Sequence, residues 1–471
     1  MRIAVSIAKS LAGLFALAML AGLAWLWISP PDLIRLGSSY AAKIICSNAL
    51  LAGRDPDEVL TLDVQAPGHP LLKLMQAEVE EDEARVRAAL LGVFGSGYAV
   101  FREGMGCASI PEEDFELAGQ RAVNRPPGIA NPSLWPVGDR VEPAPGAAVA
   151  SVVNDPLLTG PGMRAVVIVR NGRIIAESYG PGFTHDMPLL GWSMTKAVNA
   201  AIAGTVAADG RLSVDDGNLF PAWSEDGRAD ITLGHLLGME SGLAFNEYYG
   251  GVTDVTRMLY LEPDMAAFAA DKPLLHPPGM HFAYSSGSSI LAARVWQNAI
   301  GDAEAALEWP YRMLFAPLGM DTAVLETDAH GTFAGSSYLY ASARDWARFG
   351  LLLLREGVWQ GRRILPEGWV EWMRTPTEAS GGEYGRGIWL HGPRINEPPD
   401  SDPDAGFELP EDAYWLIGHD GQTMTIVPSL RLIVLRMGLT PTRLGYKPQA
   451  LVEAVVKALD VSEGGGTVTG P

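Results

Sequence analysis

The apolar residues of the chain first form one long uninterrupted run near the N-terminus. Residues 11–28 read LAGLFALAMLAGLAWLWI, and Arg2 and Lys9 precede this run. A helix of about 20 apolar residues is long enough to cross a bilayer, and tryptophans at its end suit the membrane interface. We therefore expect residues 1–31 to be an uncleaved membrane anchor, with a cleaved signal peptide as the alternative. Positive residues before the span predict that the rest of the chain is exported to the periplasm.

Residues 32–150 show a weaker pattern and are interpreted as an N-terminal extension. Within it, residues 84–91 and 98–102 alternate as strands do, and a proline-rich stretch typical of a linker or surface lid closes the region. The chain has only two cysteines, Cys46 and Cys107. In an oxidising compartment this pair predicts one disulfide; two buried thiols are the alternative.

The pattern becomes clearer from residue 164 onward. Two alternating segments flank Asn171-Gly172, which is a strong hairpin signal. An alanine-rich helix follows Lys196 and ends at Gly210, and a strand-strand-strand-helix pattern fills residues 414–459. Further helices are expected to begin after Thr232, Ser288 or Ser289, and Ser342, and residues 461–471 are expected to be a disordered tail.

This order predicts an α/β (α+β) fold. The helical middle lacks the regular strand-helix alternation of a parallel doubly wound sheet. An antiparallel sheet flanked by helices, with a mostly helical insertion, agrees better with the pattern. We assign residues 151–460 to this domain.

The composition and the motifs that are missing argue against nucleic-acid binding and against a metal site. Hydrophobic residues make up 48% of the 471 residues, and the formal net charge is −20. Nucleic-acid binding depends on clustered lysine and arginine, and the sequence contains no such cluster. It also contains no Cys-x-x-Cys or His-Glu-x-x-His spacing, so a metal site is not expected.

One motif carries candidate nucleophilic chemistry. Ser193-Met194-Thr195-Lys196 places a hydroxyl and an amine one helical turn apart. A serine becomes nucleophilic when a neighbouring base accepts its proton, and a lysine held neutral can do so. Alone the motif is weak, because Ser6-Ile7-Ala8-Lys9 repeats it inside the apolar leader.

Two later segments strengthen the hypothesis. Tyr284 stands in a loop just before the helix expected at residue 290, where its phenol can face a neighbouring site. Residues 418–422 (GHDGQ) interrupt two strand patterns, and Gly421 permits a close backbone approach. The N–H group of Gln422 can then serve as an oxyanion donor.

At these three places the sequence resembles the superfamily of serine β-lactamases, penicillin-binding proteins and esterases. Ser193-Met194-Thr195-Lys196 resembles its first motif, Tyr284-Ser285-Ser286 its second and His419-Asp420-Gly421 its third. The second and third motifs are most similar to class C-like proteins of the 6-aminohexanoate-dimer hydrolase type. The resemblance covers roughly residues 150–460.

Two residues depart from the common pattern. Ser286 stands where β-lactam-active members commonly carry asparagine, and His419 stands where many carry lysine. Both changes argue against firm binding of a carboxylate-bearing β-lactam. The expected function is therefore hydrolysis of an amide or ester bond of a small molecule.

The resemblance implies catalysis by Ser193, Lys196 and Tyr284 through an acyl-enzyme. Gln422, His419, Gly421, Ser286 and Trp192 are the candidate substrate-binding or oxyanion residues. His235 is interpreted as structural, and His281 as a weaker candidate for the pocket. The substrate and the oligomeric state are not predicted.

Three alternatives are retained. The chain could be a β-lactamase or D-Ala-D-Ala carboxypeptidase, or a non-catalytic binding protein that kept the fold. An α/β-hydrolase esterase is disfavoured because the Gly-x-Ser-x-Gly motif is absent.

Overall fold

The computed structural model describes residues 2–119, 122–123, 125, 131–142 and 147–464. Within these, the chain forms two compact units. The smaller comprises residues 1–102, 107–120 and 248–263; the larger comprises residues 103–106, 121–247 and 264–471. This division differs from the expected ranges, because residues 248–263 belong to the unit that contains the N-terminus and residues 121–150 do not.

The larger unit is built on a five-stranded antiparallel sheet in the order β12-β13-β14-β5-β6. Its strands are β5 (Met163–Arg170), β6 (Arg173–Tyr179), β12 (Tyr414–Gly418), β13 (Gln422–Val427) and β14 (Leu432–Gly438). The β5–β6 hairpin turns at Asn171 and Gly172, which both have positive φ, as two-residue hairpin turns require. The mixed fold class predicted from the sequence is confirmed.

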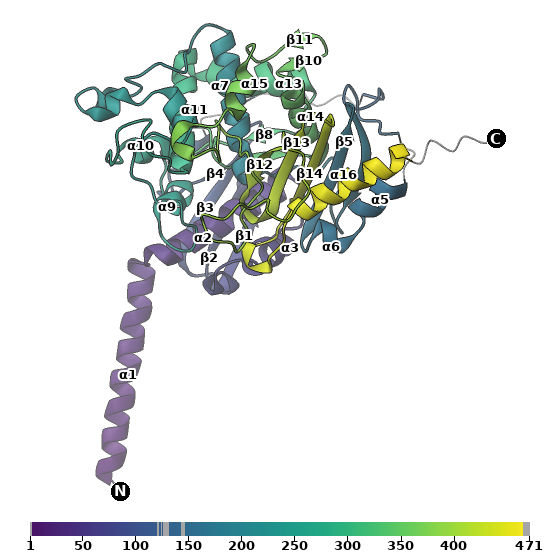
Figure 1. Ribbon diagram of the computed structural model, residues 1–471. Helices are drawn as coiled ribbons and strands as arrows, with labels where there is room; N and C mark the ends of the chain where they lie inside the picture. The colour runs from purple at the N-terminus through teal and green to yellow at the C-terminus, as the bar shows by residue number, and fades with distance from the viewer. Residues whose placement is uncertain (1, 120–121, 124, 126–130, 143–146, 465–471) are drawn as a thin grey trace, which may run out of the picture. The chain divides into compact units, whose positions relative to one another are not determined.

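Helices cover both faces of this sheet because its central strands are apolar on both faces. Val166, Ile168 and Val434 are buried with α5 (Ala147–Val153) and α16 (Gln449–Gly464), and Figure 1 shows these two helices together beside the strands. On the other face lies α14 (Ala343–Leu354). A Cβ on its Gly350 would lie 2.5 Å from the Met424 sulfur, so a glycine lets the helix approach the sheet.

The expected helical insertion forms the rest of the larger unit. Its helices are α7 (Thr195–Ala208), α8 (Leu233–Leu237), α10 (Met265–Ala270), α11 (Ser286–Ile300), α12 (Ala303–Pro310), α13 (Ala316–Leu318) and α15 (Trp369–Arg374). The remaining elements are α6 (Pro156–Thr159), β7 (Leu189–Leu190), β8 (Val324–Leu325), β9 (Leu339–Ala341), β10 (Val358–Trp359) and β11 (Arg362–Arg363). Asn199 joins α7 to α11, since it donates to the Ser289 carbonyl and accepts from the Trp296 indole.

The smaller unit has a four-stranded sheet in the order β1-β2-β3-β4. Its elements are α1 (Arg2–Ile28), α2 (Asp32–Cys46), α3 (Pro56–Val59), β1 (Met75–Glu80), β2 (Arg85–Leu90), β3 (Phe94–Arg102), β4 (Gly106–Ser109), α4 (Phe115–Gly119) and α9 (Asp254–Tyr260). Helix α2 packs on the sheet so closely that a Cβ on Gly97 would lie 2.4 Å from the Ser39 nitrogen. A disulfide between Cys46 and Cys107 then ties the end of α2 to β4, as predicted.

Helix α1 contains the apolar run. Residues 9–28 form one helix with a mean hydropathy of 2.1, and none of this segment is buried. Within the described residues it is the one helix long and apolar enough to cross a membrane. Together with the disulfide, such a helix is typical of an exported protein.

The sequence placed most elements of the larger unit correctly but misplaced some ends. Helix α11 begins at Ser286 with Ser285 as its N-cap, three to four residues before the expected start, because the Ser285 hydroxyl accepts from the Ser288 N–H. Helix α16 continues to Gly464, so residues 461–464, which were expected to belong to a disordered tail, are helical. Residues 465–471 lie outside the described part of the chain.

We expect the disulfide to stabilise the smaller unit. Replacing both Cys46 and Cys107 by alanine should lower the free energy of unfolding by about 2–5 kcal/mol, because the crosslink restricts the unfolded chain. Chemical denaturation followed by circular dichroism measures this change. Reductant should destabilise the wild type to a similar extent and leave the double variant unaffected; equal midpoints for wild type and variant would contradict the prediction.

Candidate active site

Ser193 lies in a tight turn that opens helix α7. A short 3₁₀ segment (Trp192–Met194) leads directly into the helix at Thr195. Trp192 has a φ of 48°, which is unusual for a bulky residue. A Cβ on Gly191 would lie 2.1 Å from the Trp346 ring, so only glycine fits before this turn. Ser193 is the one partly accessible residue between buried neighbours, which presents its hydroxyl at a helix N-terminus.

The Lys196 amine is buried beside this hydroxyl. Its Nζ lies 3.1 Å from Ser193 Oγ, 3.2 Å from Ser286 Oγ and 3.2 Å from the Ser336 carbonyl oxygen. The residue is 2% exposed. Three oxygen atoms from three separate segments therefore surround an amine that water hardly reaches.

This burial makes Lys196 a plausible base. Desolvation lowers the pKa of Lys196 from 10.5 to about 8, while the nearby Glu247 carboxylate opposes the shift. At pH 7 a pKa of about 8 leaves roughly one lysine in ten neutral, against about one in three thousand at 10.5. The neutral amine can accept the Ser193 proton across the existing hydrogen bond.

Glu247 is a buried carboxylate that sequence reasoning missed. Its Oε1 accepts from Ser286 Oγ at 2.6 Å, and its Oε2 accepts from the Ser286 N–H at 2.7 Å. Burial raises the pKa of Glu247, and the Lys196 charge and the Ser286 hydrogen bonds oppose this. A lone glutamate in a loop carries no local signal, because its partners stand 39 and 51 positions away in the sequence.

Ser286, a candidate substrate-binding residue, lies within this cluster. It is fully buried, and its hydroxyl links the Lys196 amine to the Glu247 carboxylate. We expected it to bind substrate, as the amide at this position does in β-lactam-active relatives. In the structure its hydrogen bonds join Lys196 to Glu247 beside Ser193.

Tyr284 completes the cluster around Ser193. It hydrogen-bonds Ser193, and the Lys196 Nζ lies 4.7 Å from the centre of its ring. Burial raises the pKa of Tyr284 well above its usual range, although the Ser193 hydrogen bond opposes this. Tyr284 thus stays a neutral phenol that can donate a proton, and Lys196 is the stronger candidate for the base.

The third motif lies between strands β12 and β13 and borders the site. Gly418 ends β12, and a Cβ there would lie 2.3 Å from the Gly191 carbonyl oxygen, so glycine allows contact with the turn before Ser193. The Gln422 side chain is not free for substrate, because it donates to the His419 and Gly438 carbonyls and accepts from the Gly438 N–H. Its backbone N–H, at the start of β13, is the group we retain as an oxyanion donor. The Gly421 backbone is fixed in place, since its carbonyl accepts a hydrogen bond from buried Arg436.

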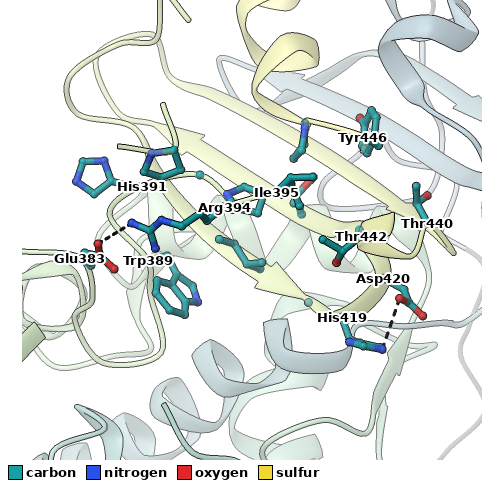
Figure 2. Close-up of a pocket in the computed structure, with 18 residues that line it drawn as sticks. Glu383, Trp389, His391, Arg394, Ile395, His419, Asp420, Thr440, Thr442 and Tyr446 are labelled. Atoms are coloured by element: carbon teal, nitrogen blue, oxygen red, sulfur yellow. Dashed lines mark hydrogen bonds and ion pairs between the residues drawn. The ribbon is translucent and has the colours of Figure 1, made fainter. Parts of the chain in front are cut away.

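His419 and Trp192 line the accessible side. Their ring centres are 5.5 Å apart, and the His419 side chain is 40% exposed. His419 also borders a cavity of about 250 Å³. Figure 2 shows His419 and Asp420 across from Trp389 and the Arg394–Glu383 ion pair on its walls. Trp389 stacks near Tyr284 with ring centres 5.2 Å apart, so the cavity adjoins the catalytic cluster.

The other histidines lie elsewhere. His235 is structural, as interpreted: it forms a capping box with Thr232 at the start of α8. His281 is exposed and stacks on His276, with ring centres 4.2 Å apart.

One group of side chains has the composition of a metal site. His391, Asp402 and Asp404 present ligand atoms within 4.8 Å of one another. Hydrogen bonds account for the arrangement, because Asp404 accepts from Gly392 and contacts His391, while Asp402 accepts from the Asp404 N–H. The cluster therefore gives no reason to assign a metal.

Comparisons with solved structures agree with this geometry. The chain is similar to "Putative 6-aminohexanoate-dimer hydrolase from Bacillus anthracis" (TM-score 0.51, 21% identity, covering 64% of this chain and 79% of that one). It is also similar to a penicillin-binding protein homologue from Caulobacter crescentus (TM-score 0.51, 16% identity, 68% and 99%). A family VIII carboxylesterase gives comparable values (TM-score 0.50, 16% identity, 68% and 99%). At these identities the likeness shows the fold.

A comparison with curated protein sequences finds no match. The family model described as Beta-lactamase matches residues 154–443, which is more than half of the chain. This range holds all three motifs and lies within the domain predicted from the sequence. The chain therefore belongs to the Beta-lactamase family, within the superfamily of serine β-lactamases and penicillin-binding proteins, whose members are generally serine hydrolases.

Proposed function

We propose that this protein hydrolyses an amide or ester bond of a small molecule through an acyl-enzyme on Ser193. The observation that carries the proposal is the hydrogen bond of 3.1 Å between Ser193 Oγ and the buried, weakly basic Lys196 amine. A pure binding protein has no need of a desolvated lysine, because burying an amine costs stability.

In the acylation step, Ser193 Oγ attacks the substrate carbonyl carbon while its proton passes to Lys196 Nζ. The carbonyl oxygen becomes an oxyanion, for which the backbone N–H groups of Ser193 and Gln422 are the proposed donors. The bond to the leaving group then breaks, and the neutral Tyr284 phenol supplies its proton. Lys196 returns the transferred proton to Tyr284 through the hydrogen-bonded cluster, so the charges balance.

Deacylation reverses the roles. Lys196 is a neutral amine once acylation is complete. A water molecule then attacks the ester carbon and gives its proton to Lys196. The ester bond to Ser193 breaks, and Ser193 Oγ recovers a proton from Lys196. No cofactor or metal is needed for either half-reaction, because every transferred proton has a donor and an acceptor in the cluster.

The cavity beside His419 favours a polar substrate of modest size. It offers an aromatic wall at Trp389 and charged groups at Arg394 and Glu383, which are ion-paired at 2.7 Å. His419 takes the place of a fixed positive charge, so a carboxylate is held less firmly than by lysine. This supports a linear amide or ester over a β-lactam.

We further propose that α1 anchors the protein in the inner membrane with the catalytic domain in the periplasm. Helix α1 has the length and composition of a span, and two basic residues precede its apolar core. The Cys46–Cys107 disulfide requires an oxidising compartment to persist, which agrees with export.

The nucleophile can be tested without knowing the substrate. A fluorophosphonate probe should label Ser193, and replacing Ser193 or Lys196 by alanine should slow labelling by at least about a thousandfold, since such residues act as a unit. Mass spectrometry of the digested protein locates the label. A Ser213→Ala variant, which removes an exposed serine outside the site, should label like the wild type.

Label on a different serine, or none on a folded protein, would refute the proposed mechanism. If Ser193 is labelled, turnover of a linear ester and of a chromogenic cephalosporin distinguishes the proposed hydrolase from a β-lactamase.

The rate of labelling should also depend on pH through Lys196. We expect it to rise with pH and level off above about pH 8, because only the neutral amine accepts the Ser193 proton. Glu247→Gln removes a carboxylate that favours the protonated amine, so the midpoint should move to lower pH. The measurement is the labelling rate constant across the pH range from about 6 to 10.

An exposed carboxylate serves as the control for this shift. Glu371→Gln on α15 removes one negative charge at the surface and should leave the midpoint unchanged. If the Glu247→Gln midpoint stays fixed or moves upward, Glu247 does not act on the Lys196 charge.

A further inference from the structure

Exposed apolar side chains gather at one end of the smaller unit. Leu91 and Val93 form the turn between β2 and β3, and they are 52% and 46% exposed. Leu74, which is 49% exposed, lies beside them, since its carbonyl accepts from the Leu91 N–H at 2.8 Å. We call these three residues the apolar tip. Large side chains exposed together mark a surface that contacts a partner or a membrane.

The apolar tip lies next to the end of helix α1. Phe94, the residue after Val93, meets Trp27 edge to face with ring centres 6.4 Å apart. Gly95 lies against Pro30, where a Cβ would come within 3.0 Å of the proline ring. The turn is thus held where the apolar helix leaves the folded unit, and Figure 1 shows α1 projecting from this unit.

The two ends of the same sheet differ in charge. The turn between β1 and β2 carries Glu81, Asp82 and Glu83, all exposed. Strand β2 runs from this acidic turn to the apolar tip, and six residues at about 3.3 Å each separate the two ends by roughly 20 Å. At the tip, the Arg87 guanidinium donates to the Gly92 carbonyl and to Ser96.

A bilayer surface fits this polarity. Apolar side chains insert at the boundary between headgroups and acyl chains, a neighbouring cation favours anionic lipids, and acidic groups are repelled from them. Trp27 at the end of α1 contacts Phe94 beside the tip, and tryptophan prefers that same boundary. The apolar tip and the cation lie at one end of the sheet and the acidic turn at the other, which is the arrangement expected of a unit that contacts a membrane at its tip.

We propose that the apolar tip inserts into the surface of the bilayer that α1 spans, so that the smaller unit has two contacts with the membrane. This inference rests on the proposed anchoring by α1. A single helix leaves the attached unit free to tilt and rotate, and a second contact at the tip restricts this motion.

The test places a fluorophore at three positions of the full-length protein. Because both native cysteines are paired, a single new thiol can be labelled with nitrobenzoxadiazole. The variants are Leu91→Cys at the tip, Asp82→Cys at the acidic turn and Ala16→Cys within α1. Each protein is reconstituted into vesicles of phosphatidylethanolamine and phosphatidylglycerol, with and without a doxyl-labelled lipid that quenches only fluorophores in contact with lipid.

We expect the doxyl lipid to quench the labels at positions 16 and 91 and not the label at 82. Quenching at 16 without quenching at 91 would overturn the tip contact and leave the anchor standing. No quenching at 16 would overturn the anchor, and the inference with it. A label at 91 that is shielded from water yet unquenched indicates a protein partner instead, and quenching at 82 would contradict the orientation.

Val93→Cys provides a second probe of the tip if Leu91→Cys fails to fold. Circular dichroism of each labelled protein verifies that the sheet is intact. Position 93 should behave as position 91 does, and an unquenched label there would overturn the proposal equally.

Discussion

The burial of one amine, that of Lys196, is the constraint on which the catalytic site depends. Moving a charged ammonium group out of water is unfavourable, and moving the neutral amine out of water is less unfavourable. Three oxygen atoms, from Ser193, Ser286 and Ser336, satisfy the amine while water is excluded. Glu247 limits the decrease in the pKa of Lys196, because its carboxylate favours the charged amine. The opposition of burial and charge leaves the pKa of Lys196 at about 8.

Close approaches of the backbone bring these groups together. Gly191 and Gly418 let the turn before Ser193 contact the end of β12, and neither position has room for a side chain. Gly387 similarly lies against α7, where a Cβ would come within 2.8 Å of the Lys196 carbonyl. The end of β12, the turn before Ser193 and helix α7 are therefore held by close contacts that only glycine permits. Substrate selection falls to the cavity walls, where His419, Trp389 and Arg394 stand.

The smaller unit is defined by its disulfide, its apolar tip and its acidic turn. Its disulfide fastens α2 to β4, and the three exposed residues of the apolar tip lie beside the end of α1. Its own acidic residues are kept at the opposite end of the sheet. None of the three sequence motifs lies in this unit.

The sequence by itself determined the family, the fold class and the main strands of the larger sheet, because hairpin turns, helix caps and the three motifs are local patterns. It also predicted the pairing of its two cysteines and the apolar N-terminal helix. It did not indicate Glu247, the hydrogen bond between Ser286 and Glu247, or the smaller unit's use of residues 248–263. Those depend on contacts between residues far apart in the chain. A glutamate in a loop acquires its partner, its burial and its pKa only when folding brings distant helices around it, so the tertiary structure alone decided them.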